Sequence, residues 1–186
     1  QMDIEYIQSC RLLDVQLPGR LKKCFKGPKF GMPEIKRRAG AENRPLLGGI
    51  IKPKTGMNLE EMIEICRQLL EGGVDFIKED EILGNPACCP FRERVKAISE
   101  LVNDFGEREG REIFYAPCIN SDYPHFIDRA KYAAECGAKA IHLNIWAGFG
   151  AYRALRELDL GTALFFQKSG DQVITCEDNV YSISWR

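Results

Sequence analysis

The chain has 186 residues, a net charge of −1 and a hydrophobic fraction of 45%, a composition typical of a soluble globular protein with enough apolar residues for a core. The near-zero charge gives no electrostatic case for binding nucleic acid or an anionic membrane surface, and no apolar run reaches the roughly 18 residues that span a bilayer. The eight cysteines accompany only two histidines and lack zinc-site spacing. We therefore expect reduced cysteines and a cytoplasmic protein.

The expected elements change in character near residue 45. Before it we expect only a helical turn or two near residues 21–25 and a short helix over residues 33–38. After it, strands are expected at residues 46–52, 75–78, 113–119, 140–145 and 163–167. Helices are expected at residues 58–71, 91–109, 123–136 and 150–158, with a further helix starting within residues 179–186. Asn58 and Glu61 form a plausible capping box. Short apolar strands alternating with helices predict a parallel sheet with crossover helices.

The second expected strand ends in a lysine set among carboxylates, Lys78-Glu79-Asp80-Glu81. Side chains alternate along a strand, so Lys78 and Asp80 point to one side and Glu79 to the other. Glu81 lies past the strand end and is free to turn inward. Burying a lysine beside carboxylates costs free energy, which makes this cluster a candidate functional site. Asp80 and Glu81 offer the hard oxygen ligands that Mg²⁺ prefers, and carbamylation of Lys78 by CO2 would add a third.

The first expected strand also ends in lysines. Pro53 cannot donate to a sheet and should end the strand, so that Lys52 and Lys54 share one side of the extended chain. Later strands are followed by further polar residues: Asn120, Asn144, Gln167 and Lys168. Chemistry collects at the C-terminal ends of parallel strands, although any such loop is also polar simply because it lies on the surface.

Two motifs with matching order and spacing resemble the ribulose bisphosphate carboxylase (RuBisCO) large-chain superfamily. They are Arg44-Pro-Leu-Leu-Gly-Gly-Ile-Ile-Lys-Pro-Lys-Thr-Gly56 and Gly72-Gly-Val-Asp-Phe-Ile-Lys-Glu-Asp-Glu81. The next stretch, Ile82-Leu-Gly-Asn-Pro-Ala-Cys-Cys-Pro-Phe91, resembles the RuBisCO-like proteins more than the true carboxylases. The resemblance implies a (β/α)8 barrel, and the motif match favours it over an open parallel α/β sheet, which the alternation alone would also fit.

The resemblance also implies roles for the residues at the strand ends. Lys78 would be the carbamylated lysine, with Asp80 and Glu81 as the other Mg²⁺ ligands. Lys52 would be the proton-transfer lysine, with a pKa lowered by the metal and a second cation, and Lys54 would donate to substrate oxygens. The substrate-binding residues would be Asn120, Asn144, Gln167 and Lys168, with Lys168 as a cation for a phosphate. Glu79 would be a structural partner.

Several positions depart from the carboxylase pattern or stand outside the family's catalytic set. Ile50 occupies a position where carboxylases have threonine, and Gln167-Lys168 replaces their His-Arg pair. Gln167 cannot transfer protons. His142 aligns with no catalytic histidine of the family and is interpreted as a packed histidine, and His125 as a surface residue opening a helix.

Size sets the expected domain plan. A complete barrel takes about 250 residues, so residues 45–186 are expected to supply the first five βα units, and residues 1–44 a lead-in from an N-terminal domain. The preferred function is Mg²⁺-dependent enolisation, of isomerase, enolase or decarboxylase type, of a phosphorylated ketose or sugar acid, by a homodimer. An authentic carboxylase and a non-catalytic truncated barrel that serves as an interaction remnant are the alternatives.

Overall fold

Parallel strands alternate with helices through residues 27–167, one of the two compact units into which the chain divides. The computed structural model describes residues 6–184. The strands of this unit are β2 (Gly48–Ile50), β3 (Phe76–Lys78), β4 (Phe114–Ala116), β5 (Ala140–Asn144) and β6 (Ala163–Gln167). The helices are α2 (Met32–Arg38), α3 (Leu59–Glu71), α4 (Phe91–Glu109), α5 (His125–Glu135) and α6 (Phe149–Leu158), with a 3₁₀ turn η1 (Ile145–Ala147). No helix in the described part of the chain is long and apolar enough to cross a membrane.

Local sequence accounts for the helix ends. The Asn58 side chain accepts from the Glu61 N–H at the start of α3, while the Glu61 side chain accepts from the Asn58 N–H, which confirms the expected capping box. At the end of α4, Gly110 adopts a left-handed conformation with φ 66°, which glycine enters at little cost. These signals fix the helices between the strands, and therefore the positions at which each strand begins.

The strands of this unit pair in parallel in two groups, β2-β3-β4 and β5-β6. An isolated parallel bridge between Cys118 and His142 links the two groups. Parallel pairing brings the C-terminal ends of neighbouring strands to one edge. The residues that follow β2, β3, β4 and β5 are thereby placed at the same end of the sheet.

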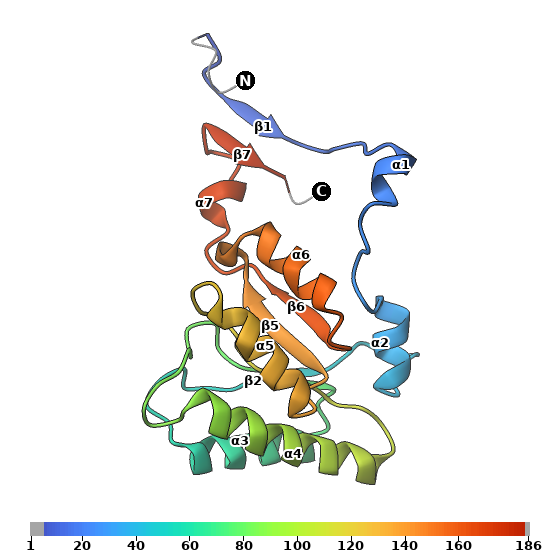
Figure 1. Cartoon of the computed structure of the whole chain (residues 1–186), viewed down its shortest axis with the longest axis vertical. Helices are drawn as coiled ribbons and strands as arrows, with labels where there is room; N and C mark the ends of the chain where they lie inside the picture. Colours follow the sequence, from blue (N-terminus) through green and yellow to red (C-terminus); the bar gives the residue numbers. More distant parts are fainter. Residues whose placement is uncertain (1–5, 185–186) are drawn as a thin grey trace. The chain divides into compact units, whose positions relative to one another are not determined.

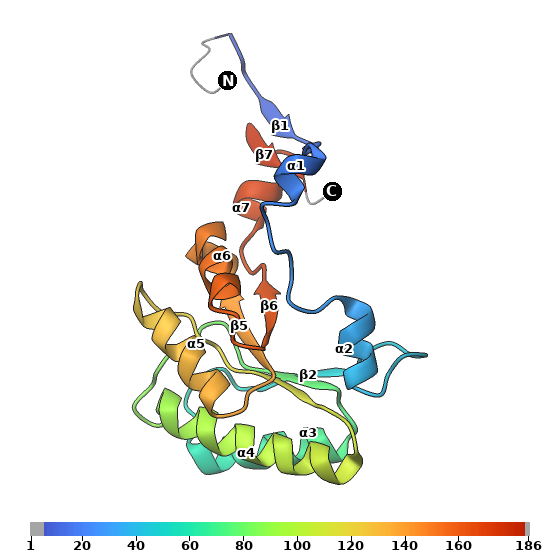
Figure 2. The ribbon, with the colours of Figure 1, turned by 45° about the vertical axis from the view of Figure 1, so that its right-hand side comes forward.

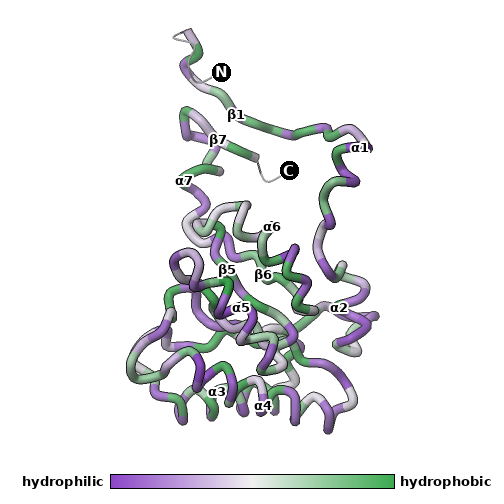
Figure 3. The backbone as a smooth tube through the Cα atoms, in the orientation of Figure 1, coloured by the Kyte–Doolittle hydropathy of each residue, from purple (hydrophilic) through white to green (hydrophobic). Residues whose placement is uncertain are grey.

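The two faces of the strands have different surroundings. Ile77, Tyr115, Ile141 and Leu143 point into a core shared with the helices, and α3 and α4 pack side by side on that face (Figure 1). In the tube coloured by hydropathy, hydrophilic and apolar residues alternate along α3 and α4 (Figure 3). A separate inner cluster joins strand residues to α2 and the segment after it: Ile35, Ala39, Ala41, Phe76, Phe114, Ala116, Ala140 and Phe165.

The other compact unit combines the residues before 27 with those after 167. It holds β1 (Cys10–Leu12), α1 (Gly19–Lys22), α7 (Gln172–Thr175) and β7 (Tyr181–Ile183), and β1 pairs with β7 in parallel (Figure 2). The expected helix within residues 179–186 is wrong, since β7 is a strand there, and residues 185–186 lie outside the described part. The strand β1, with which β7 pairs, is about 170 residues away in sequence. No local pattern could therefore have revealed the pairing.

The fold class is the expected one, a mixed α/β chain of parallel strands and crossover helices. The boundary predicted at residue 45 follows the family's domain plan and stays a prediction. Within the described structure, α2 and the segment leading into β2 belong to the compact unit of residues 27–167. The first helix of that unit contributes Ile35 to the inner cluster.

Candidate functional site

Lys78 ends β3 as a buried lysine, with only 2% of its surface exposed. Its Nζ lies 3.3 Å from Oε2 of Glu81, so Glu81 does turn inward as expected. Asp80 is buried on the same side, at 3% exposure. A buried ammonium needs such a partner, because transferring an unpaired charge from water costs several kcal/mol.

Lys52 joins this cluster from the segment after β2. Its ammonium donates to Oδ2 of Asp80, and the Asp80 Oδ1 accepts from the Ile82 N–H at 3.1 Å. The hydrogen bond to Asp80 raises the pKa of Lys52 above its ordinary value. The lowering of this pKa by a bound metal and a second cation stays a prediction.

Glu79 points to the opposite side and is fully buried. Arg94 of α4 donates to it from Nε at 2.8 Å, and the Cys118 N–H donates at 2.7 Å. The Tyr115 hydroxyl donates to the same carboxylate; burial first, and then the charge of Glu79, raise the pKa of Tyr115. The structural role expected for Glu79 is confirmed: this network anchors the residue between Lys78 and Asp80.

Asn120 and Asn144 tie the loops of the site together. The Asn120 amide donates to the Glu81 carbonyl at 2.6 Å, and its Oδ1 accepts from the Asn144 N–H at 2.8 Å. The Asn144 side chain accepts from the Trp146 N–H at 3.0 Å. Both amides therefore hold backbone in place, and their contact with substrate stays a prediction.

Three predicted site residues remain: Lys54, Gln167 and Lys168. Lys54 is exposed, and no hydrogen bond or ion pair of its side chain is found with described residues. Gln167 ends β6 in register with Asn144, at the same edge as the cluster. Lys168 belongs to the other compact unit, and its role stays a prediction.

Arg94 is a buried residue near the cluster that was not predicted, whereas the two histidines were. Arg94 extends from α4 to Glu79, and its position in the apolar stripe, three residues after Phe91 and one before Val95, is the signal that could have predicted its burial. His142 is buried, as expected for a packed histidine. However, neither of its ring nitrogens has a hydrogen-bond partner among the described residues. His125 is exposed at the start of α5, as expected.

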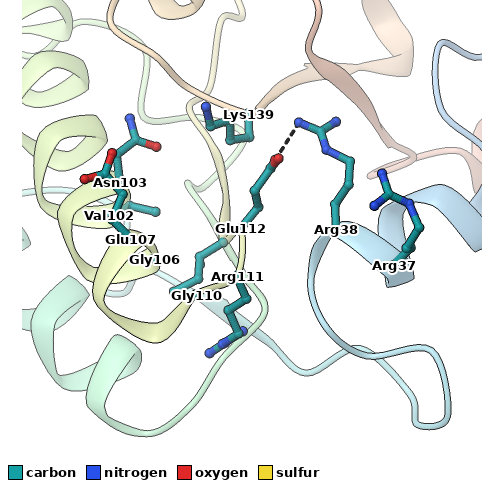
Figure 4. A pocket seen from close by; sticks show the side chains of 11 residues that line it. Arg37, Arg38, Val102, Asn103, Gly106, Glu107, Gly110, Arg111, Glu112 and Lys139 are labelled. Carbon is teal, nitrogen blue, oxygen red and sulfur yellow. Dashed lines mark hydrogen bonds and ion pairs between the residues drawn. The ribbon is translucent and has the colours of Figure 1, made fainter.

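Two clefts lie at opposite ends of the strands. One of about 440 Å³ adjoins the cluster and is lined by Glu81, Asn120, Asn144 and Trp146, among others. The other, of about 540 Å³, lies where β4 and β5 begin (Figure 4). Its Arg38 is bound to Glu112 at 2.5 Å, and its Arg111 to the distant Asp75. The cleft beside Glu81 is therefore the one of these two that adjoins the cluster.

The donor set fits a hard divalent cation only in part without modification of Lys78. Asp80 and Glu81 supply carboxylate oxygens at one strand end, as Mg²⁺ prefers. Among residues 6–184, no group of three or more His, Cys, Asp and Glu side chains is arranged to hold a metal. A carbamate on Lys78 would supply the third anionic oxygen ligand, and the burial of that lysine next to Glu81 is consistent with it.

Known proteins are similar to this chain in sequence and in fold. A 3-oxo-isoapionate-4-phosphate decarboxylase from Rhizobium rhizogenes is 34% identical over 98% of this chain and 45% of its own length. A 2,3-diketo-5-methylthiopentyl-1-phosphate enolase from Bacillus pumilus is 36% identical over 79% and 36%. The octameric RuBisCO of Pyrococcus horikoshii superposes with a TM-score of 0.90 at 29% identity, covering 97% of this chain and 44% of that one.

The chain spans less than half the length of these proteins. The family described as ribulose bisphosphate carboxylase large chain, catalytic domain, matches residues 31–183, which include the whole lysine and carboxylate cluster. By this match and by its parallel strand–helix fold, the chain belongs to the RuBisCO large-chain family, with relatives among its RuBisCO-like enolases and decarboxylases.

Proposed function

We propose that the complete protein enolises a phosphorylated ketose or sugar acid, as an isomerase, enolase or decarboxylase of the RuBisCO-like type, without fixing CO2. The observation that carries this proposal is the Lys52–Asp80 ion pair beside the buried Lys78–Glu81 pair. It brings an exposed lysine that can move a proton next to carboxylates that can hold a cation. The names of the decarboxylase and enolase relatives specify phosphorylated substrates, which supports this substrate class.

Lys78 as its carbamate, Asp80 and Glu81 would hold Mg²⁺. When bound, Mg²⁺ acts as a Lewis acid that polarises a substrate carbonyl and so acidifies the neighbouring C–H. The Asn120 amide holds the backbone of Glu81 in place, which keeps the carboxylate near Lys78. Lys54, Asn144, Gln167 and Lys168 are the proposed donors to substrate oxygens, with Lys168 as the cation for a phosphate.

Lys52 is the proposed acid–base group. It can accept a proton at Nζ only as the neutral amine, whereas the hydrogen bond to Asp80 favours the charged form. After abstraction the same ammonium can return the proton, which is sufficient for enolisation.

The chain offers fewer polar groups than carboxylation requires. Ile50 places an apolar side chain two residues before Lys52, and Gln167 places an amide at the end of β6. Neither group can exchange protons with an enediolate or with a hydrating water. Proton abstraction and return need only a base and a cation, so the proposal stops at enolisation or at loss of CO2 from a sugar acid.

Deuterium exchange combined with labelled bicarbonate tests both parts of the proposal. The complete protein, with Mg²⁺, is incubated in D2O with candidate ketose phosphates, including the substrates named for the relatives. We expect deuterium at the carbon next to the carbonyl, and its loss in Lys52→Ala but not in Lys96→Ala, an exposed lysine of α4. Label from bicarbonate in a phosphoglycerate would refute the non-carboxylase part. No deuterium uptake with any candidate while metal is bound would refute enolisation.

Assembly and location are also proposed for the complete protein. We infer a homodimer, in keeping with solved relatives described as dimeric or octameric. A cytoplasmic location agrees with the free cysteines found in the described structure. Sedimentation analysis of the complete protein tests the dimer.

A further inference from the structure

His142 is a polar residue buried inside the sheet. The residue is 0% exposed, and Nδ1 and Nε2 are both without a partner among the described residues. A neutral imidazole carries one N–H donor and one acceptor nitrogen. Leaving such a group buried and unsatisfied costs about 1–3 kcal/mol. A polar partner that forms only in the working protein would remove this cost.

The position of His142 places its ring on the inner face of the strands. Its neighbours Ile141 and Leu143 point into the core with the helices, so His142 points to the other face. The ring packs edge-on against Phe165, with 5.8 Å between ring centroids. The same phenylalanine ring lies 5.9 Å from Nζ of Lys78. Phe165 thus adjoins both the histidine and the lysine.

The His142 ring carries at least one N–H whether it is neutral or charged. Burial lowers the pKa of His142 to about 4, and the positive charge of Lys78 adds to the lowering, opposed by Glu81 and Asp80. Those three side chains are the charged groups that act on the histidine. The ring therefore keeps one N–H to donate, and the apolar Phe165 beside it offers no competing acceptor.

Lys78 cannot satisfy the ring as an ammonium, because an ammonium has donors only and its nearest partner is Glu81. A carbamate on Lys78 would instead supply hydrogen-bond acceptors. The neutral amine forms a C–N bond to CO2, one C=O π bond opens to become the carboxylate, and the two protons of the original ammonium that are lost pass to solvent. The product carries two acceptor oxygens beyond Nζ.

We propose that His142 is a positioning residue for Lys78. The ring N–H of His142 donates a hydrogen bond to a carbamate oxygen on that lysine. The inference rests on the carbamate of the proposed function and assigns a role to a residue outside its ligand set. The hydrogen bond holds the carbamate in one rotamer and stabilises it against loss of CO2. Hydrogen bonds to charged groups are worth enough for an effect of about tenfold on the carbamylation equilibrium.

Carbamate formation on the complete protein tests this directly. Carbon-13 NMR with labelled CO2 and Mg²⁺ measures the CO2 concentration at half-carbamylation. We expect His142→Leu to raise it about tenfold, and His142→Gln, which keeps a donor, to raise it only about threefold. His125→Leu, which removes the exposed histidine, is the matched control and should leave it unchanged. Thermal melting shows whether each variant is folded.

A second measurement separates positioning from simple packing. The ring ¹⁵N resonances of His142 should shift when CO2 is added to the wild type, and should not shift in Lys78→Ala. An unchanged CO2 requirement in His142→Leu, with carbamate visible, would overturn the role of His142 and leave the proposed function standing. No carbamate signal in the wild type would instead overturn the carbamate of the proposed function, and this inference with it.

Discussion

Lys78, Glu79 and Asp80 are consecutive in sequence but lie in two environments. Alternation along β3 turns the first and third toward Lys52 and Glu81, and the second toward Arg94. The period of two in a strand made this division predictable. The identity of the partners was not predictable, because Lys52 and Arg94 come from other elements and their approach depends on packing.

The carboxylate of Asp80 is predicted to be essential for metal binding. In the complete protein, Asp80→Ala should abolish Mg²⁺-dependent proton exchange and weaken Mg²⁺ binding at least tenfold, because it removes one of two carboxylates at the strand end. Isothermal titration with Mg²⁺ and the exchange assay measure the two effects. Asp104→Ala, on the exposed face of α4, is the control. Unchanged Mg²⁺ affinity in Asp80→Ala would reject the assignment.

The buried pair of Glu79 and Arg94 is predicted to matter for stability. Both side chains are fully buried, so Glu79→Gln leaves the guanidinium without its charge partner. We expect the free energy of unfolding to fall by about 3–5 kcal/mol, as measured by urea denaturation. Glu64→Gln, which breaks an exposed pair with Arg67, should cost less than about 1 kcal/mol. Equal effects in the two variants would contradict the buried network.

At the scale of elements, the sequence predicted the alternation well and the strand lengths less well. α4 and β6 match their expected bounds, whereas β2 and β4 are shorter than the apolar runs that contain them. Apolar composition reports burial, and residues such as Ile113 and Ile119 are buried beyond the ends of the strand itself. Strand length also depends on where the neighbouring strand ends, which a single sequence does not reveal.

Asp75, just before β3, is predicted to make stability depend on acid. Burial alone would raise the pKa of Asp75, but hydrogen bonds from Arg44 and the Leu47 N–H, with the charge of Arg111, outweigh burial and lower it. Because the pKa of Asp75 is lower in the folded state than its unfolded value of about 3.9, the ionised carboxylate stabilises the fold at pH values above that unfolded pKa. That stability is lost as the pH falls through the folded pKa.

The test compares the free energy of unfolding of wild type and Asp75→Asn between pH 6 and pH 3. We expect the wild type to be the more stable at pH 6, and its advantage to shrink as the solution is acidified. The change removes the charge and keeps the side-chain shape. A gap between the two proteins that stays constant over this range would contradict the linkage.

At the scale of the whole molecule, the site draws on strands from a single compact unit. Residues 27–167 contain Lys52, Lys78 and every carboxylate of the cluster, which is why the strand-end motifs alone indicated the site. Lys168 follows the end of that unit, and the pairing of β1 with β7 depends on contacts across most of the chain. Long-range pairing of this kind leaves no periodic signature in sequence.

The polypeptide of residues 1–186 is predicted to associate when expressed by itself. In the described structure β2 and β6 each have one strand neighbour, and Ile50 on β2 is 49% exposed. Unpaired parallel edges with apolar side chains recruit other chains. Light scattering after gel filtration should show oligomers, and Ile50→Lys should shift them toward monomer more than Ile82→Lys, in the loop after β3. A monodisperse wild-type monomer that melts cooperatively would contradict this.

The division of β3 between two faces also sets how the protein tolerates insertions. One extra residue between Phe76 and Lys78 would turn each following side chain of the strand to the opposite face. Glu79 would then enter the position of a neighbour of Lys52, while Lys78 and Asp80 would be carried into the pocket of Arg94 and the Tyr115 hydroxyl. A single added codon would thus harm the site and the core together, whereas the loop after Glu81 can vary in length without this penalty.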